Sequence, residues 1–470
     1  MLNRPCFWYN WKAARPFGPL RAFRRETHAL KKKNRITTFQ VISFSFLCFI
    51  LLGTGLLMLP FASTGPGSAG FADCFFTATS AVCVTGLVVR DTATSWTPFG
   101  QAVILVLIQI GGLGVVTAAV ALAFISGKKI GLMQRSTMQE AIAAPQVGGI
   151  VRLTRFIVVA TLLMELIGAL LLLPSFWIAY GLPKALWLSF FHSISAFCNA
   201  GFDLMGFQGP FSSMTGFAQH PGVNPVLILL ITVGGIGFLV WNDVKEHRFH
   251  FKQYRLQSKI VLITSAVMVL VPFLWFLAFE MGPLSLGERL WPALFQSVTL
   301  RTAGFNTVDL AQFSGGGQAV MIFFMLVGGS PGSTAGGMKT TTVAVLLLTA
   351  RAVFKRRNHV ECMGRRIGDE AVRQAVAIIV MYFSLFFLSG VVISRIENLP
   401  LLTCLFETAS AIGTVGVTLG ITPGLGLVSR GILVVLMFLG RVGGLTLIYA
   451  AQPTRLGDQS TLPLEKITVG

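Results

Sequence analysis

Long and short apolar stretches alternate along the chain. Eight long stretches approach the ~20 residues that a helix needs to cross ~30 Å of hydrocarbon. Four shorter stretches lie between alternate long ones, and each ends in a run that contains glycine. A short apolar helix leaves backbone groups at membrane depth, which is tolerated only inside protein or along a water-filled cavity. The pattern predicts an all-α polytopic membrane protein with eight transmembrane helices, over 41–59, 102–125, 156–180, 226–241, 260–279, 320–350 with an interruption, 375–393 and 432–450.

The four short stretches are copies of one motif. They read FFTATSAVCVTGL (75–87), FFHSISAFCNAGF (190–202), LFQSVTLRTAGF (294–305) and LFETASAIGTVGV (405–417). Their marker glycines lie 115, 103 and 112 residues apart, at Gly86, Gly201, Gly304 and Gly416, and the third copy is one residue shorter. A glycine pair follows each copy, at Gly111-Gly112, Gly234-Gly235, Gly328-Gly329 and Gly443-Gly444. Two motifs repeated in one order predict four pseudo-symmetric repeats of helix, pore helix and helix around a central pore.

The repeats divide the chain into segments. We expect a basic cytoplasmic N-terminus over 1–35 and a cytoplasmic C-terminal tail over 454–470. Between them we expect repeat 1 over 36–127, repeat 2 over 128–245, repeat 3 over 246–356 with the interruption, and repeat 4 over 357–453.

The charges indicate the orientation. The 37 Lys and Arg against 18 Asp and Glu give a net charge of +19, which alone would suit a nucleic-acid partner. However, 54% of the residues are hydrophobic and only 12% are charged, which excludes a conventional cytosolic enzyme. The loops on one side of the predicted helices and the two chain ends carry a net charge of +20, and the rest carries −1. The positive-inside rule therefore predicts cytoplasmic termini and outward-facing glycine runs, with no nucleic acid.

Residues that could carry catalysis are scarce. The seven cysteines have no CxxC spacing and an odd total, so neither a disulfide framework nor a zinc site is indicated. His192 and Ser193 are adjacent, and the positions that match His192 in the other copies are Thr77, Gln296 and Glu407, as expected for polar residues of pore helices. We therefore expect no enzymatic activity and no organic cofactor.

The glycine runs suit a desolvated cation. A ring of backbone carbonyls can replace the hydration shell of the ion. Glycine permits unusual backbone geometry and brings no side chain into the pore. Short helices that point their C-terminal ends at the centre add a fractional negative charge. Few acidic residues lie close to the runs, and Asp91, Asp203 and Asp309 are at most rim charges.

The copies CVTGL, CNAGF, RTAGF and TVGV resemble the selectivity filters of the Ktr/Trk/HKT superfamily of potassium transporters, over residues 36–452. Eight spans without an additional N-terminal helix pair are most similar to the KtrB membrane subunits. Glycine at all four marker positions is the family pattern for potassium preference, whereas sodium-favouring plant relatives have Ser at the first. The resemblance implies potassium as the substrate and a filter made by Cys83, Val84, Thr85, Gly86, Cys198, Asn199, Ala200, Gly201, Arg301, Thr302, Ala303, Gly304, Gly413, Thr414, Val415 and Gly416.

The same resemblance implies partners and a location. It implies a homodimer in the bacterial plasma (inner) membrane, in contact with membrane lipids. A cytosolic ring of RCK subunits of the KtrA/TrkA type, which bind ATP, ADP or NAD, would regulate it, and sodium stimulation is common in the Ktr branch. Two alternatives stay open. One is a TrkH-like subunit linked to protons, and the other is the potassium-translocating subunit of a P-type ATPase complex.

The long stretch after the third copy is interrupted by VGGSPGSTAGGMKTTT (327–342). Proline and clustered glycines break a helix. The run does not match the phosphate-binding pattern GxxxxGK[ST], because Met338 separates Gly337 from Lys339. In the family the corresponding loop obstructs the path on the cytoplasmic side of the filter. The resemblance thus implies a gate made by Gly328, Gly329, Gly332, Ser333, Thr334, Gly336, Gly337, Lys339 and Arg441.

Four charged residues within apolar runs have competing interpretations. Arg301 either bonds the loops or a pore helix from behind the filter, or tunes ion affinity. Lys339 holds the loop shut by pairing with carbonyls or an acidic group, repels cations, or snorkels to the cytoplasm. Arg441 either faces the pore below the filter or joins an ion pair between helices. Glu165 is as compatible with packing against a polar partner as with transport. The counterparts of Arg441 in the other repeats are expected to be Gln109, Thr232 and Leu326.

Overall fold

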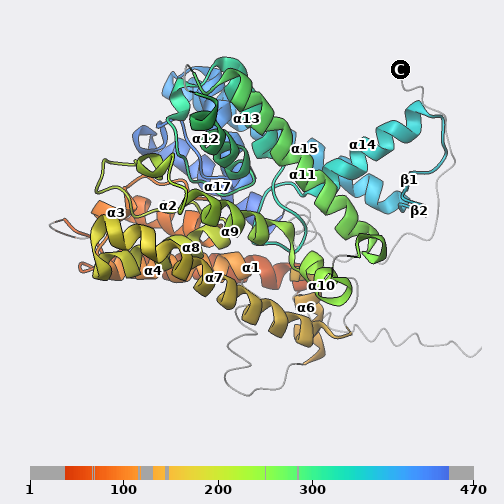
Figure 1. Cartoon of the computed structure of the whole chain (residues 1–470), viewed down its shortest axis with the longest axis horizontal. Coiled ribbons are helices and arrows are strands. Elements are labelled where there is room, and N and C mark those ends of the chain that lie inside the picture. Colours follow the sequence, from red (N-terminus) through yellow and green to blue (C-terminus); the bar gives the residue numbers. More distant parts are fainter. Residues whose placement is uncertain are drawn as a thin grey trace, which may run out of the picture. The chain divides into compact units, whose positions relative to one another are not determined.

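The computed structural model describes residues 37–443, apart from 66, 68, 115–116, 118–130, 143–147, 249 and 283–284. The predicted N-terminus (1–35), the predicted tail (454–470) and Gly444 lie outside the described residues. Helices dominate the described chain, as predicted (Figure 1). The strands in these residues are β1 (Glu361–Cys362) and β2 (Arg365–Arg366), which pair antiparallel.

The four repeats open with α1 (Thr38–Leu57), α7 (Ile150–Tyr180), α11 (Leu256–Phe279) and α15 (Asp369–Glu397). These helices have 20, 31, 24 and 29 residues, and each is long and apolar enough to cross a membrane. Their outward faces are apolar too, since Leu162, Leu166 and Leu170 on α7 are each more than half exposed. A soluble protein rarely exposes so large an apolar face, so these faces suit lipid contact.

The four motif copies form the pore helices α2 (Phe71–Val82), α8 (Leu182–Phe197), α12 (Leu286–Thr299) and α16 (Leu401–Gly413). They have 12, 16, 14 and 13 residues, fewer than the ~20 that a span needs. The same aromatic of each copy anchors its helix in the core. These side chains, Phe76, Phe191, Phe295 and Phe406, are at most 1% exposed.

The second helices of the repeats are α4 (Pro98–Leu113), α9 (Asn224–Ile236), α13 (Gly315–Leu326) and α17 (Leu427–Val442). The predicted unbroken helices over 102–125, 226–241 and 432–450 are wrong, because α4, α9 and α17 end at Gly114, Gly237 and Gly443. The φ angles of 83°, 103° and 91° at these glycines cannot continue a right-handed helix. After α9 the chain bends by 94° into α10 (Phe238–His247). A helix end inside the predicted second span, expected in the third repeat alone, is therefore present in all four.

By length and composition, four described helices can cross a membrane unbroken, and the bent pair of α9 and α10 makes a fifth. The shorter apolar helices in the described residues include α4, α13 and α14 (Thr340–Phe354), the last of which follows the third break. The other described helical segments are α3 (Thr92–Ser95), α6 (Leu132–Ile142), η1 (Thr215–Phe217), η2 (Phe251–Gln253), η3 (Leu310–Gln312) and η4 (Thr422–Gly424).

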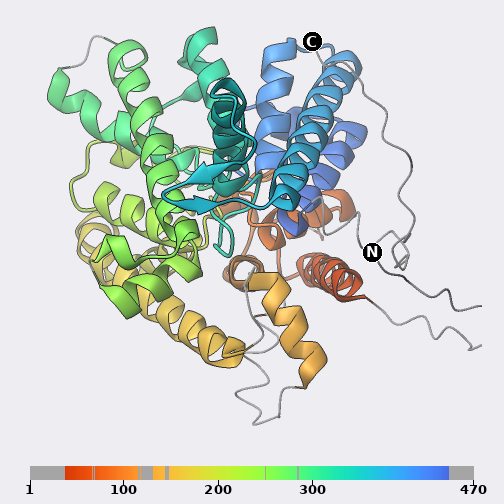
Figure 2. The same cartoon turned by 90° about the vertical axis from the view of Figure 1, so that its right-hand side faces the viewer.

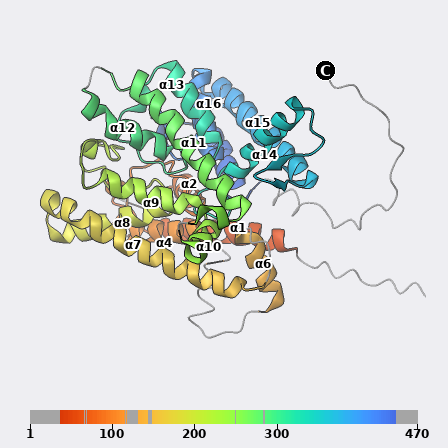
Figure 3. The same cartoon turned by 45° about the vertical axis from the view of Figure 1, so that its right-hand side comes forward.

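The repeats pack in a closed cycle. Each second helix packs against the pore helix of the next repeat: α4 on α8, α9 on α12 and α13 on α16, while α17 returns to α2. Figure 2 shows this order as colours that run around the centre from red through yellow and green to blue. Within repeat 2, α7 and α8 lie side by side (Figures 1 and 3). The cycle brings the ends of all four pore helices to one place, and the predicted pseudo-symmetric fold is confirmed.

Candidate functional site

The four marker glycines approach one another around the centre of the cycle. A Cβ atom added to any of them would collide with the backbone of the next repeat, and the last contact returns to the first repeat. The distances from that Cβ to a carbonyl oxygen are 2.5 Å at Gly86 (Ala200), 2.8 Å at Gly201 (Ala303), 2.8 Å at Gly304 (Val415) and 2.1 Å at Gly416 (Thr85). The four runs therefore form a ring that only glycine can close.

The backbone of the four runs alternates in handedness. Two residues before each marker glycine, Val84, Asn199, Thr302 and Thr414 have φ angles of 56°, 58°, 66° and 51°. The marker glycines have φ angles of 94°, 70°, 85° and 92°. Left-handed geometry is uncommon outside glycine, and for the β-branched valine and threonines it is a genuine outlier. Strain shared by all four copies is typical of functional sites, where the surroundings hold it in place.

The pore helices hold this geometry through the N–H groups of the runs. The N–H groups of Thr85, Ala200 and Val415 donate to the fifth carbonyl back along the chain, each at 2.8 Å. In the shorter third copy the Ala303 N–H donates to Thr299 at 2.9 Å. In a trans peptide the C=O points opposite to the N–H. The carbonyls that precede these N–H groups, those of Val84, Asn199, Thr302 and Thr414, therefore point away from the pore helices.

The carbonyl oxygens of the runs have no protein partner. Among the described residues, none of the carbonyls at 84–85, 199–200, 302–303 and 414–415 accepts a hydrogen bond. Buried carbonyls are normally paired, since burying a polar group without a partner is costly. A ring of unpaired oxygens at the ends of four helices is a site that can replace the water shell of a cation.

Four of the residues predicted for the filter lie just before the strained positions. Cys83 and Cys198 cap α2 and α8, Gly413 is the last residue of α16, and Arg301 follows α12. On one side of the ring a cavity of about 100 Å³ borders all four marker glycines, and Asp91 and Asp203 line it. Asp309 is exposed, does not line this cavity, and caps η3 instead.

The loop over 327–339, which we call the gate loop, is folded on itself. Gly328 and Gly329 donate to the carbonyls of Met338 at 2.8 Å and Gly336 at 3.2 Å. Ser333 donates to the carbonyl of Ser330 at 2.7 Å. The Gly332 carbonyl accepts the Phe238 N–H at 2.7 Å. The loop is therefore an ordered structure.

The gate loop lies directly against the ring. A Cβ added at Gly336 would be 2.2 Å from the Thr414 hydroxyl. The Thr334 hydroxyl donates to the carbonyl of Phe197, at the end of α8, at 3.0 Å. Gly337 donates to the carbonyl of Gly440 on α17 at 3.1 Å. The loop of repeat 3 thus contacts repeats 2 and 4 at once.

Two cations hold the gate loop. The ammonium of Lys339 donates to the loop carbonyls of Ala335 at 2.9 Å and Gly336 at 3.4 Å, which fits the predicted pairing with carbonyls. The guanidinium of Arg441 donates to the Thr334 carbonyl, and on its other side to the carbonyls of Gly111 and Gly112 in repeat 1. Both side chains border a cavity of about 260 Å³ on the side of the ring where the gate loop lies.

The family emerges from comparison with known proteins. The TrkH family, described as "Cation transport protein", matches residues 13–455. This chain belongs to the TrkH family. It is 39% identical to the Ktr system potassium uptake protein B of Bacillus subtilis, over 89% of this chain and 94% of that one. It is 37% identical to the potassium/sodium uptake protein NtpJ of Enterococcus hirae, over 93% of this chain and 98% of that one. These relatives are transporters and not enzymes, in line with the sequence.

A solved structure shares the fold. The crystal structure of the potassium transporter TrkH from Vibrio parahaemolyticus matches with a TM-score of 0.71, at 20% identity, over 92% of this chain and 87% of that one. Together with the apolar helices, the family membership makes this chain a multi-pass bacterial membrane protein.

The structure corrects the register of the glycine pairs in this TrkH-family chain. A Cβ at Gly111, Gly234 or Gly440 would meet the carbonyl of the last or next-to-last residue of a pore helix at 2.1, 2.0 and 2.2 Å. Gly440, and not Gly443, is therefore the counterpart of Gly111 and Gly234. Arg441 consequently occupies the position of Gly112 and Gly235, and the predicted alignment with Gln109, Thr232 and Leu326 is wrong.

Arg301 and Glu165 lie behind the ring. The Arg301 guanidinium donates to the Ser265 hydroxyl at 3.0 Å and the Gly235 carbonyl at 3.5 Å. The Arg301 carbonyl accepts from the Asn199 amide at 3.1 Å. Glu165 on α7 is buried and accepts from the Gln109 amide at 3.1 Å, a polar partner from the neighbouring repeat.

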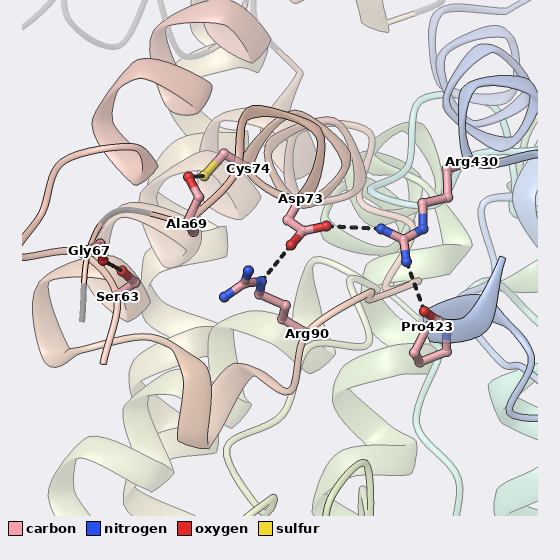
Figure 4. Close-up of polar contacts among 8 residues, drawn as sticks. All are labelled: Ser63, Gly67, Ala69, Asp73, Cys74, Arg90, Pro423 and Arg430. Carbon is pink, nitrogen blue, oxygen red and sulfur yellow. Dashed lines mark hydrogen bonds and ion pairs between the residues drawn. The ribbon is translucent and has the colours of Figure 1, made fainter. Parts of the chain in front are cut away.

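An ion-pair cluster that the sequence did not reveal joins repeats 4 and 1 (Figure 4). Asp73, in the first turn of α2, accepts from Arg90 at 2.6 Å and from Arg430 of α17 at 2.9 Å. Arg430 also donates to the Pro423 carbonyl at 2.8 Å. Repeats 4 and 1 are not consecutive in sequence, so no chain segment links them directly. The cluster joins them by ion pairs instead. The sequence indicates no role for Arg90 or Arg430.

Proposed function

We propose that this TrkH-family protein takes up potassium selectively across the bacterial plasma membrane, with the four glycine runs as its filter. The ring of unpaired, strained carbonyls carries the proposal, because a desolvated monovalent cation is the ligand that such oxygens fit. Transport through the filter is passive and driven by the membrane potential. The names of relatives such as the Ktr system potassium uptake protein B support potassium as the substrate.

We propose the gate loop as the barrier to flux on the cytoplasmic side. Its contact with Thr414 and its bonds to repeats 2 and 4 support this role, because they hold the loop directly against the ring. Arg441 acts as the latch, since one guanidinium joins the loop to repeat 1. Opening then requires these bonds to break together.

Regulation comes from partners in this proposal. The Ktr-system names of two relatives support a cytosolic regulatory partner, and we propose an RCK ring that binds ATP, ADP or NAD in this role. The strongly basic cytoplasmic segments offer it a docking surface, and anionic lipid attracts the same charges. The protein acts as a homodimer with cytoplasmic termini. The name of the Enterococcus relative includes sodium beside potassium, and we propose sodium here as a stimulating ion.

Uptake in a bacterial strain that lacks its own potassium uptake tests the proposal. We expect saturable potassium uptake, at a rate that a co-expressed RCK protein changes. Uptake that persists after collapse of the proton gradient at constant membrane potential excludes a proton-linked subunit. Uptake that depends on a co-expressed P-type ATPase would replace our proposal with the ATPase-subunit alternative. Absence of uptake with and without the RCK protein would overturn it.

Replacing Arg301 by Gln separates its two interpretations. The shorter, neutral side chain loses its bonds to Ser265 and Gly235, so we expect the unfolding free energy to fall by about 1–3 kcal/mol. The ratio of potassium to sodium uptake should stay unchanged. Thermal unfolding in detergent and uptake assays measure the two effects, with the exposed Arg395→Gln as a charge-matched control. A changed potassium KM at unchanged stability would favour electrostatic tuning instead.

A further inference from the structure

A buried layer of polar side chains recurs in the four pore helices. Thr77, His192, Gln296 and Glu407 occupy the same position in the four motif copies, and each is at most 1% exposed. A pore helix that only had to fill space would carry an apolar residue here, because a buried polar group without a partner is costly. The polar residue therefore needs a partner at this position.

The partner is the segment that leaves the ring on its outer side. The Nε2 atom of His192 accepts the Leu204 N–H at 3.2 Å, and the Gln296 amide donates to the Thr307 hydroxyl at 3.4 Å. The Glu407 carboxylate accepts from the Thr422 hydroxyl at 3.1 Å and from the Thr418 hydroxyl. Leu204 and Thr307 lie three residues after their marker glycines, and Thr418 and Thr422 lie two and six residues after Gly416. In three repeats, the side chain at this position therefore joins the segment after the ring to the pore helix, and we call this contact a rung.

The three rungs differ in their number of bonds, and the first repeat has none among the described residues. Glu407 has the most partners, because each of its two carboxyl oxygens accepts from a hydroxyl. At the other extreme, the Thr77 hydroxyl is buried and has no hydrogen-bond partner among the described residues. The outer end of the fourth run is thus the most firmly held, and that of the first the least.

We propose that Glu407 is a positioning residue that sets ion selectivity by fixing the outer carbonyls of the fourth run. The inference rests on the proposed potassium filter. A ring of fixed diameter fits a cation of one size. If one of the four runs is loosely held, the ring can contract around a smaller cation at little cost in free energy. Glu407 does not touch the ion, and it acts through Thr418 and Thr422 in the segment that follows the ring.

The test compares variants in the full chain in membranes. Glu407→Gln keeps the shape but replaces one acceptor oxygen with an NH₂ group that cannot accept. We expect the potassium-to-sodium uptake ratio to fall about tenfold, the change that the loss of one hydrogen bond at the upper end of the usual range produces. Thr418→Val keeps the shape and removes one of the two bonds to Glu407, together with the bonds of this hydroxyl to Gly420 and Thr422, and should also lower the ratio.

Two control variants separate the effect of the Glu407 rung on ion selectivity from effects on protein stability. Thr77→Val alters the same layer without removing a bond, so the ratio should stay at the wild-type value. Glu397→Gln removes a carboxylate that accepts from Gly426 and Ser429, away from the ring, and should lower thermal stability alone. A ratio that moves only with stability, across all four variants, would mean a merely structural role.

The outcomes are distinguishable. A wild-type protein without potassium uptake would sink the proposed function itself. Wild-type uptake together with an unchanged ratio in Glu407→Gln, at normal protein levels in the membrane, would overturn only the positioning role. If Glu407→Gln fails to reach the membrane, Thr418→Val decides, and an unchanged ratio there has the same meaning.

Discussion

Replacing Gly416 by alanine is expected to abolish potassium uptake. The residue has a φ of 92°, which an alanine reaches only with strain. The new methyl group would also lie 2.1 Å from the Thr85 carbonyl and 3.0 Å from the Gly86 Cα of the first repeat. Neither neighbour is the flexible end of a side chain, so the backbone of the ring itself has to move. We expect a loss of at least 100-fold in uptake, since a misplacement of ~1 Å costs this much in other preorganised sites.

The matched control for this variant is Gly431→Ala, in the same repeat. Gly431 lies on the exposed side of α17, and an added Cβ would meet nothing within 4 Å. Alanine is the better helix former by about 0.5–1 kcal/mol, so this variant should be as stable as the wild type or slightly more. Uptake rates, normalised to protein in the membrane, measure both. Normal potassium uptake and selectivity in Gly416→Ala would show that the ions do not pass through this ring.

The sequence predicts the repeats and the glycine runs because both repeat at the level of single residues. Four backbones meet at the marker position and leave room only for glycine, so every copy has glycine there, as Gly86 and Gly416 show. The breaks at Gly114, Gly237 and Gly443 were missed for the opposite reason. Nothing in an apolar stretch tells a glycine that packs within a helix from one that ends it, since both lie among the same residues.

The register error has a physical cause as well. Arg441 fills a position that is glycine in two other repeats, so the local sequence Gly440-Arg441 hides its match with Gly111-Gly112. Only the contact of Gly440 with the carbonyl of Ile412 reveals it. The exchange of glycine for arginine is what allows one side chain to reach the gate loop. A departure from the repeat pattern therefore marks a candidate functional residue in this chain.

The ion pair of Asp73 with Arg430 could not be predicted, because the two residues are 357 positions apart and neither lies in a motif. The rung contacts of Glu407 could be predicted from the sequence only in part. The sequence shows a polar residue at the matching position of every copy, but only the fold reveals that the partners follow the marker glycines.

Releasing the gate loop is expected to raise potassium flux in the absence of any regulator. Deleting Ser333 to Gly337 removes the Thr334 bond to Phe197, the Gly337 bond to Gly440, and the carbonyl that Arg441 binds. Three hydrogen bonds of about 1 kcal/mol each would shift the balance between closed and open states by roughly 100-fold. We therefore expect a basal flux at least tenfold above that of the wild type, measured as uptake without an RCK protein.

Two substitutions at position 441 distinguish a latch from an electrostatic barrier. Arg441→Gln removes both the charge and most of the donors, so flux rises under either mechanism. Arg441→Lys keeps the charge, but an ammonium cannot span two sets of carbonyls as the planar guanidinium does. If Arg441 is a latch, held between Thr334 and Gly111, the lysine variant should conduct almost as freely as the glutamine variant. Flux as low as in the wild type would show that the charge alone bars the ions. Unchanged flux in the glutamine and deletion variants alike would remove the gate loop from the mechanism, because nothing then remains for its bonds to control.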